Sequence, residues 1–386
     1  MKFSLRTILF ALALALAPQV AAQKVQVEKK VESQNQVELE KRVEQKVEPP
    51  HTAAGEDFAL ERRAEAEPKA VVSLCLSTGD VVVRGWDRGE VRARAEEAGN
   101  LRLLTPNVRP SPRVEVLVSE DKDSEPGSGD CGSTSMIELM VPRGATVSIQ
   151  TQNGRVEVSD VAEARIKALS GDVEVRRISQ AIEVSCLSGD VSVSDSSGPV
   201  RVSTISGVVE ARSLRTISPG DNFEAKSTSG DVTLEGIAHT QVEGSTVSGN
   251  VLYTGALARG GSYDFRTISG DVTLELPANA SFNLHAKVVV SGDIDTDFPI
   301  KTTAAANGNG VLINPSDIQV VVVPVPGPTP HVETPPEPTG PKKPGKNKPP
   351  KPPKEPVQTR LDGTVGTGDA VVNLSSFSGS VHLRRQ

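Results

Sequence analysis

Ser170-Gly171-Asp172-Val173-Glu174-Val175 is a motif that recurs, with small changes, up to the C-terminus of this chain. Glycine adopts a positive φ without a Cβ clash, and Ser and Asp side chains bond the nearby backbone, so Ser-Gly-Asp is typical of a tight bend. We therefore assign the Gly-Asp pairs as structural turn residues whose side chains bond locally. These residues are Gly79, Asp80, Gly171, Asp172, Gly189, Asp190, Gly230, Asp231, Gly270, Asp271, Gly292 and Asp293.

Each bend leads into a Val-x-Val segment, which places two branched side chains on one face of a strand and a polar residue on the other. From Gly154 to Gly292 the motif glycines lie 17 to 23 residues apart. Coils of roughly 18 to 22 residues hold two short strands and two bends, and stacked coils bury a continuous aliphatic column. The sequence therefore predicts an all-β fold, a repeat β-solenoid that is β-helix-like. An antiparallel sandwich is the alternative, but it does not require the same motif at the same corner in every pass.

The composition agrees with such a core and excludes one class of partner. Aromatic residues make up 3% of the 386 residues, so the interior must be built mainly from small aliphatic side chains. The formal net charge is −7, which gives no long-range attraction to nucleic acid. We expect no nucleic-acid partner.

The chain divides into segments by composition. Residues 1–22 have the basic start, short apolar run and small residues of a signal peptide, so we expect an exported protein with no transmembrane segment in the mature chain. Residues 23–69 are predicted to be a disordered or weakly helical charged tether. The remaining segments are a solenoid domain at 70–323 with an N-terminal cap region at 70–152, a Pro/Lys-rich disordered insertion at 324–357, and the last solenoid coils at 358–386.

Three cysteines, Cys75, Cys131 and Cys186, would enter an oxidising compartment after export. Cys75 and Cys131 both lie in the N-terminal region, where they form either a disulfide or two free thiols. Cys186 falls in a strand pattern and is expected to pack as a small apolar residue. No Cys-x-x-Cys or Cys/His pattern indicates zinc, and we predict no metal and no cofactor.

Four segments, taken together and in order, carry a resemblance to a known family. They are Gly79-Asp80-Val81-Val82-Val83-Arg84-Gly85-Trp86-Asp87, Val141-Pro142-Arg143-Gly144-Ala145, Leu276-Pro277-Ala278-Asn279-Ala280 and Gly379-Ser380-Val381-His382-Leu383. The chain resembles the bacterial "putative adhesin" family, an exported domain of unknown function with Gly-Asp-Val repeats. The resemblance covers residues 70–386 apart from the Pro-rich insertion. It implies a β-solenoid-like fold and an envelope or surface location, and it carries over no catalytic residues. From the signal peptide, we expect the protein in the periplasm, on the cell surface or secreted.

The acidic residues allow two other interpretations. Aspartates at successive bends would stack as a carboxylate ladder for calcium, but calcium takes six to eight oxygens and each bend offers one Asp. Glu157 with Glu174, or Asp293 with Asp295 and Asp297, resemble the acid and base of a polysaccharide-cleaving β-helix. Solvated strand faces carry such acids too, and we predict no catalytic residues.

We therefore expect an exported, non-enzymatic β-repeat protein that acts as an adhesin or envelope-scaffold binding module. Its partner would be an unknown envelope protein or polysaccharide. The alternatives are a polysaccharide-acting β-helix enzyme and a periplasmic regulatory partner of a membrane protein. Two features stay open: the Pro/Lys tract is a spacer, a contact for anionic polymer or a Pro-rich ligand, and Trp86 packs over the first coil or binds a ligand.

Overall fold

The structure is a computed structural model that describes residues 60–121, 123, 127, 131–302, 311–312 and 359–386. In these ranges every regular element is a β-strand, and the strands join into one 26-stranded sheet. The predicted all-β solenoid is confirmed. The expected signal peptide, the tether up to residue 59 and the Pro/Lys-rich insertion lie outside the described residues. Where the chain is described, it forms no helix of the length and apolarity that a membrane span needs.

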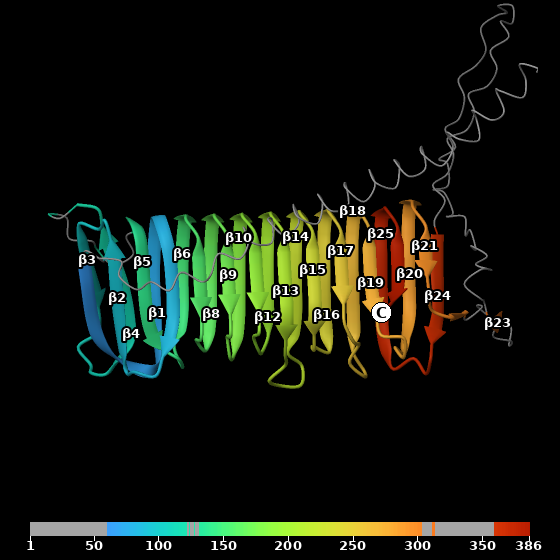
Figure 1. Cartoon of the computed structure of the whole chain (residues 1–386), viewed down its shortest axis with the longest axis horizontal. Coiled ribbons are helices and arrows are strands. Elements are labelled where there is room, and N and C mark those ends of the chain that lie inside the picture. Colours follow the sequence, from blue (N-terminus) through green and yellow to red (C-terminus); the bar gives the residue numbers. More distant parts are fainter. Residues whose placement is uncertain (1–59, 122, 124–126, 128–130, 303–310, 313–358) are drawn as a thin grey trace, which may run out of the picture. The chain divides into compact units, whose positions relative to one another are not determined.

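Each regular coil contains a long strand, a Ser-Gly-Asp type of bend, a short strand and a second, variable bend, and the coils follow one another in a row (Figure 1). Neighbouring coils pair in parallel, long strand with long strand and short strand with short strand. The long strands, in spatial order, are β6 (Thr146–Asn153), β8 (Glu163–Ser170), β10 (Ala181–Ser188), β12 (Val200–Ser206), β14 (Asn222–Ser229), β16 (Gln241–Ser248), β18 (Ser262–Ser269), β25 (Ala370–Ser378) and β20 (Phe282–Ser291). The short strands are β7 (Val156–Ser159), β9 (Val173–Arg176), β11 (Val191–Ser194), β13 (Val209–Leu214), β15 (Val232–Ile237), β17 (Val251–Thr254), β19 (Val272–Leu276), β26 (Val381–Arg385) and β21 (Ile294–Thr296).

The interior is an aliphatic column that becomes aromatic in the later coils. Val173 and Val175 are buried on either side of the partly exposed Glu174, which is the alternation that a strand with one inner face requires. Further along the column, fully buried aromatic rings replace valines, and they include Phe223, Tyr253, Tyr263, Phe265 and Phe282. The buried tyrosine hydroxyls have partners, since Tyr253 donates to the Ala256 carbonyl at 3.0 Å and Tyr263 to the His239 carbonyl at 3.1 Å.

Antiparallel strands close the N-terminal end of the stack. β1 (Leu60–Trp86) pairs antiparallel with β2 (Glu90–Glu96) through its first residues, and its later part forms the first complete coil. Folded structure therefore begins before the expected residue 70; within residues 60–69 the one buried side chain is Ala66, which leaves little apolar signal in the sequence. The other strands of this end are β3 (Asn100–Leu104), β4 (Ser111–Ser119) and β5 (Gly132–Pro142).

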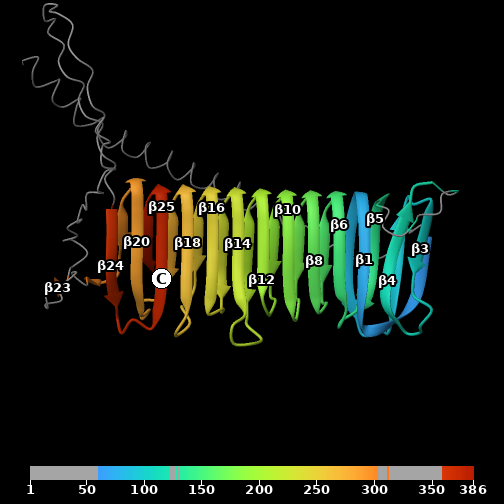
Figure 2. The same cartoon turned by 180° about the vertical axis from the view of Figure 1, so that it is seen from behind.

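The last coil in the sequence is not the last coil in space. The coil of β25 and β26 lies between the β18–β19 coil and the β20–β21 coil (Figure 2). β24 (Thr359–Val365) pairs antiparallel with β20 and with β22 (Lys301–Thr302), which itself pairs with β23 (Val311–Leu312). Residues 358–386 were expected to form the last coils; β24 does lie at that end, whereas the β25–β26 coil lies one coil further in. All coils present the same pairing edges, so the repeat pattern does not determine which coil lies next to which.

Candidate binding surface

The Ser-Gly-Asp bends stack directly on one another, which explains why they require glycine. A Cβ added to Gly230 would lie 2.0 Å from the carbonyl oxygen of Gly207 in the preceding coil. The backbone conformation and the close stacking together exclude a side chain at this position. φ lies between +120° and +152° at the six predicted bend glycines, which are Gly79, Gly171, Gly189, Gly230, Gly270 and Gly292.

The bend aspartates bond between coils rather than within their own bend. Asp172 Oδ1 accepts a hydrogen bond from the backbone N–H of Asp190 at 3.0 Å, and Asp190 Oδ1 accepts one from Val208 at 2.8 Å. Parallel stacking places each carboxylate beside the amide of the next coil, so the expected local bonding is corrected to bonding between coils. At the far end the Asp293 N–H instead donates to Ser380 Oγ at 3.3 Å. The same contact as that of Asp172 is made by Asp80, Asp231 and Asp271.

Inside the bends runs a row of small polar side chains that we did not predict. It occupies the position three residues before the bend glycine. Thr246 is 5% exposed, and its Oγ1 donates to the Gly230 carbonyl of the preceding coil at 2.9 Å. These bonds satisfy hydroxyls that would otherwise be costly in an aliphatic interior. We name Thr204, Ser227, Thr246, Thr267 and Ser376, all of which make this bond, the inner hydroxyl row.

The next residue along the same strands points outward, and in most coils it is apolar. Seven such side chains are 42% to 51% exposed. Their flanking residues pair in register from coil to coil as far as Phe377, so these side chains form a row across the strands, and Val290 continues the row at a β-bulge between Val288 and Ser291. An exposed apolar row of this kind is a candidate interaction surface. In spatial order the members are Leu169, Leu187, Ile205, Val247, Ile268, Phe377 and Val290, with Thr228 between Ile205 and Val247, and we name the seven the outer apolar row.

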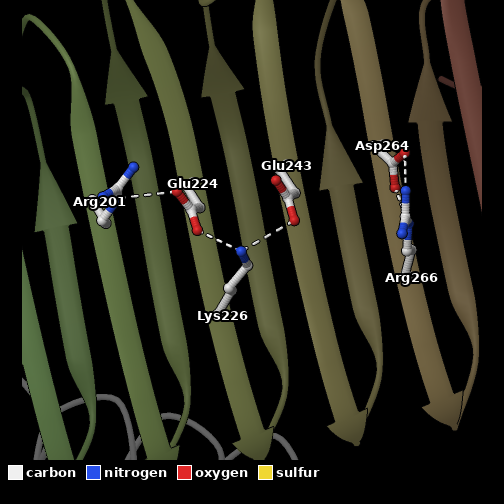
Figure 3. Close-up of polar contacts among 6 residues, drawn as sticks. All are labelled: Arg201, Glu224, Lys226, Glu243, Asp264 and Arg266. Carbon is white, nitrogen blue, oxygen red and sulfur yellow. Dashed lines mark hydrogen bonds and ion pairs between the residues drawn. The ribbon is translucent and has the colours of Figure 1, made fainter.

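Charged residues occupy further outward positions on the strands that carry the outer apolar row. Figure 3 shows the contacts among six of them. Glu224 on β14 contacts Arg201 on β12 at 3.0 Å and Lys226 on its own strand, and Lys226 reaches Glu243 on β16 at 3.2 Å. The hydrogen bond from Lys226 lowers the pKa of Glu224 below its ordinary value of 4.5. The same bond raises the pKa of Lys226 above 10.5. Both groups are therefore charged at neutral pH.

The charged band continues on β18, where Arg266 donates to Asp264 at 2.7 Å. This hydrogen bond raises the pKa of Arg266 above its ordinary value. The face thus combines a row of apolar side chains with a band of ion pairs on an exposed sheet. Such a combination suits binding to another macromolecule.

Four of the five acids that we considered for glycoside chemistry are in contact with a basic group. Arg155 lies between Glu157 at 3.1 Å and Glu174 at 3.0 Å, and the hydrogen bond that it donates to Glu174 raises the pKa of Arg155. The arrangement is an ion-pair network on an exposed strand face. Of the second set, Asp295 contacts His382 at 3.4 Å and Asp297 contacts Arg384 at 3.5 Å.

The structure joins Cys75 and Cys131 by a disulfide, which connects β1 to the segment that leads into β5. Cys186 is free and buried, and its Sγ lies 3.6 Å from the Gly171 carbonyl, in the position of the inner hydroxyl row. Burial raises the pKa of the Cys186 thiol, which keeps it protonated at neutral pH. These three cysteines therefore lie in structural positions.

Two aromatic side chains, Trp86 and His239, are held by contacts within the chain. Trp86 is partly buried, donates to the Glu90 carbonyl at 2.9 Å, and is covered by the guanidinium groups of Arg88 and Arg92 at about 5 Å from the ring centre. His239 is fully buried at a variable bend, with Nε2 2.8 Å from the Gly198 carbonyl. Burial lowers the pKa of His239, so the ring is neutral.

The coil geometry defines an all-β repeat protein with a solenoid of stacked bends. A family model described as Toastrack DUF4097 matches residues 72–323, which is more than half of the chain, and the chain belongs to that family. A search of the curated proteins found no match. Among solved structures, the chain is similar to a protein described as a putative cell adhesion protein from Clostridium sporogenes ATCC 15579, with 12% identity and a TM-score of 0.20 over 85% of this chain and 99% of that chain. At that score the similarity supports no conclusion about this chain.

Proposed function

We propose that this chain is an exported, non-enzymatic binding module, an adhesin or envelope scaffold, whose face with the outer apolar row docks on another macromolecule. The observation that carries the proposal is the outer apolar row itself. Seven side chains at one repeat position are large, apolar and 42% to 51% exposed. The fold does not require them to be apolar, because Thr228 occupies the same position in a coil that keeps its register.

The charges beside the row support a protein or polysaccharide partner. Glu224, Lys226 and Glu243 are held in fixed positions by their mutual contacts, so they provide ordered polar groups at the edge of an apolar contact. The polysaccharide-cleaving alternative requires two acids that converge on one bond with room for substrate. Glu157 and Glu174 instead share Arg155, which favours the binding function.

A capture experiment tests the proposal. The full chain, a Leu187→Asp/Ile268→Asp double variant and a Val371→Asp control would be immobilised and exposed to solubilised envelope fractions and to purified envelope polysaccharides. Val371 lies on the same face but outside the row, and it is 38% exposed. We expect the double variant to lose capture, or to lose association with further copies of the chain, while the control retains it. Equal behaviour of all three proteins would contradict the proposal.

A parallel arm tests the Pro/Lys-rich tract. Deletion of residues 324–356 would leave capture unchanged if the tract is a spacer, and would weaken it if the tract contacts an anionic polymer. Incubation of the same polysaccharides with the full chain checks the enzymatic alternative. Release of shorter products, lost on Glu174→Gln, would support that alternative instead.

A further inference from the structure

We propose that the outer apolar row is occupied by a second copy of this chain, docked side by side with its coils parallel and in the same register. This inference rests on the proposed function of that face and names its partner. It is carried by three properties of the row: its repeat distance, the charges on its two sides, and its size.

The repeat distance of the row matches the coil spacing of another β-solenoid better than the repeat of an α-helix or an extended strand. Row members lie on neighbouring parallel strands, so they repeat at about 4.8 Å. An α-helix laid along the row would repeat at about 5.4 Å per turn, and an extended strand would present same-face side chains about every 6.8 Å. Over the seven steps from Leu169 to Val290, the helix would drift by about 4 Å, nearly one full repeat. A second copy of this chain stays in register throughout.

The two positions that flank the row differ in charge: the next outward position on the strand side is basic in four coils, although Lys226 and Arg266 there also contact Glu224 and Asp264, and the bend side is acidic. On the strand side, the four basic side chains at the next outward position are Lys167, Lys226, Arg266 and Lys287. On the bend side, the same four coils carry Asp172, Asp231, Asp271 and Asp293. Where the bend residue is Val208, Asn250 or Ser380, the strand residue is Ser203, Ser245 or Ser375. In seven of the eight coils, then, an acidic bend residue accompanies a basic strand residue and an uncharged one accompanies serine. The coil with Ser185 and Asp190 is the exception.

This polarity selects one arrangement of the two copies. A two-fold axis parallel to the row places the basic side of one copy over the acidic side of the other, so that Lys167 faces Asp172 of the same coil in the second copy. A two-fold axis across the row would place basic side on basic side, which is unfavourable. Charge complementarity therefore favours parallel coils, with each row member opposite its own equivalent.

The size of the face is sufficient for a dimer. The row and its two flanking positions span eight coils, or about 38 Å, with a width of about 20 Å. This corresponds to roughly 700 Å² per copy, close to the roughly 800 Å² per partner of a standard interface. The central aliphatic side chains would be buried and the ion pairs would lie at the rim.

Cross-linking tests the register. In a Cys186→Ser background, Leu187→Cys should form a disulfide-linked dimer under mild oxidation, because each Leu187 faces its equivalent. In the antiparallel arrangement centred on Thr228, Leu187 faces Ile268, and only a mixture of Leu187→Cys with Ile268→Cys would cross-link. Val371→Cys is the matched control and should give no cross-link. Cross-linking only in the mixture would overturn the parallel arrangement.

Sedimentation velocity of the full chain tests the association itself. The wild type should be dimeric at micromolar concentration, and Leu187→Asp/Ile268→Asp should dissociate at least about tenfold more readily, because charge is buried against an apolar row. Val371→Asp should remain dimeric, and unchanged thermal melting would show that the variants fold. A monomeric wild type would overturn the inference. If such a monomer still captured an envelope component or bound phosphatidylglycerol vesicles through the row, the proposed binding function would stand but the second copy would not be the partner. If the row variants changed neither association nor capture, the proposed function and this inference would both fail.

Discussion

The inner hydroxyl row and the outer apolar row occupy adjacent positions on the same strands, yet each has the polarity expected of the other. Thr246 is buried and polar, whereas Val247 beside it is exposed and apolar. The buried hydroxyl is explained by the fold, because it donates to the Gly230 carbonyl of the preceding coil. The exposed valine has no such explanation within the chain. The difference separates residues that hold the coils together from residues that are available to a partner.

The largest loss of stability is expected from a substitution of a bend glycine, next to the two rows. Gly230→Ala would place a Cβ 2.0 Å from the Gly207 carbonyl oxygen, so the coils must separate locally. We expect a loss of about 3 kcal/mol or more in the free energy of unfolding, measured by urea denaturation. Gly220→Ala is the control, since Gly220 also has a positive φ of +99° but a Cβ added there would meet no atom within 4 Å. Equal losses in both variants would show that stacking at the bend is not the reason for glycine.

The second effect concerns the inner hydroxyl row. Thr267→Val keeps the shape of the side chain but removes the hydrogen bond to the Gly249 carbonyl, which is 2.9 Å long. We expect a loss of about 1 kcal/mol in unfolding free energy. Thr228→Val, at an exposed position of the outer row, should leave stability within about 0.5 kcal/mol of wild type. A stable Thr267→Val would mean that the inner row does not hold the coils together.

A gain of stability should follow from completing the inner hydroxyl row. Ala168 occupies the corresponding position before Gly171 and is 7% exposed. Ala168→Ser should donate to the Gly154 carbonyl and raise the unfolding free energy by up to about 1 kcal/mol. Leu169→Ser, at the adjacent exposed position, should give no gain. Differential scanning calorimetry of both variants would decide this, and a lower melting temperature for Ala168→Ser would contradict the assignment.

The smallest effect belongs to the charged band beside the outer row. The lowered pKa of Glu224 means that its ion pair with Lys226 stabilises the fold above about pH 4.5 and that this contribution is lost as the pH falls through the folded-state pKa. The raised pKa of Lys226 means that the contribution is lost again as the pH rises through its folded-state pKa, above 10.5. Because both groups are partly exposed, Glu224→Gln should cost less than about 1 kcal/mol at pH 7. The difference from wild type should shrink at pH 3, and a difference that grows there would contradict this account.

The repeated bends made the fold predictable from the sequence. Ser170-Gly171-Asp172-Val173 fixed the corner and the inward Val-x-Val pattern, because a positive φ and a period of two leave few alternatives. The direction in which Asp172 bonds was not predictable, because it depends on the coil stacked against it. The position of the β25–β26 coil was not predictable either, since every coil offers the same parallel edge.

The candidate surface was visible in the sequence but not recognised. Val184 and Cys186 point inward, and side chains alternate along a strand. Leu187, two residues before Gly189, must therefore point outward. This alternation holds at six of the seven row members and indicates an exposed apolar row, whereas Val290 is turned outward by the β-bulge after Val288. What the sequence could not provide is the alignment of those positions, because the spacing between bends varies and only the pairing register brings them into one line.

The most direct test compares Thr246→Val with Val247→Asp, two adjacent residues on β16. Melting temperature and sedimentation velocity would be measured on the same samples of each variant. We predict that Thr246→Val lowers the melting temperature and keeps the dimer, whereas Val247→Asp keeps the melting temperature and weakens the dimer. The opposite pattern, in which Val247→Asp unfolds the protein and leaves its association unchanged, would contradict the division between an inner structural row and an outer binding row.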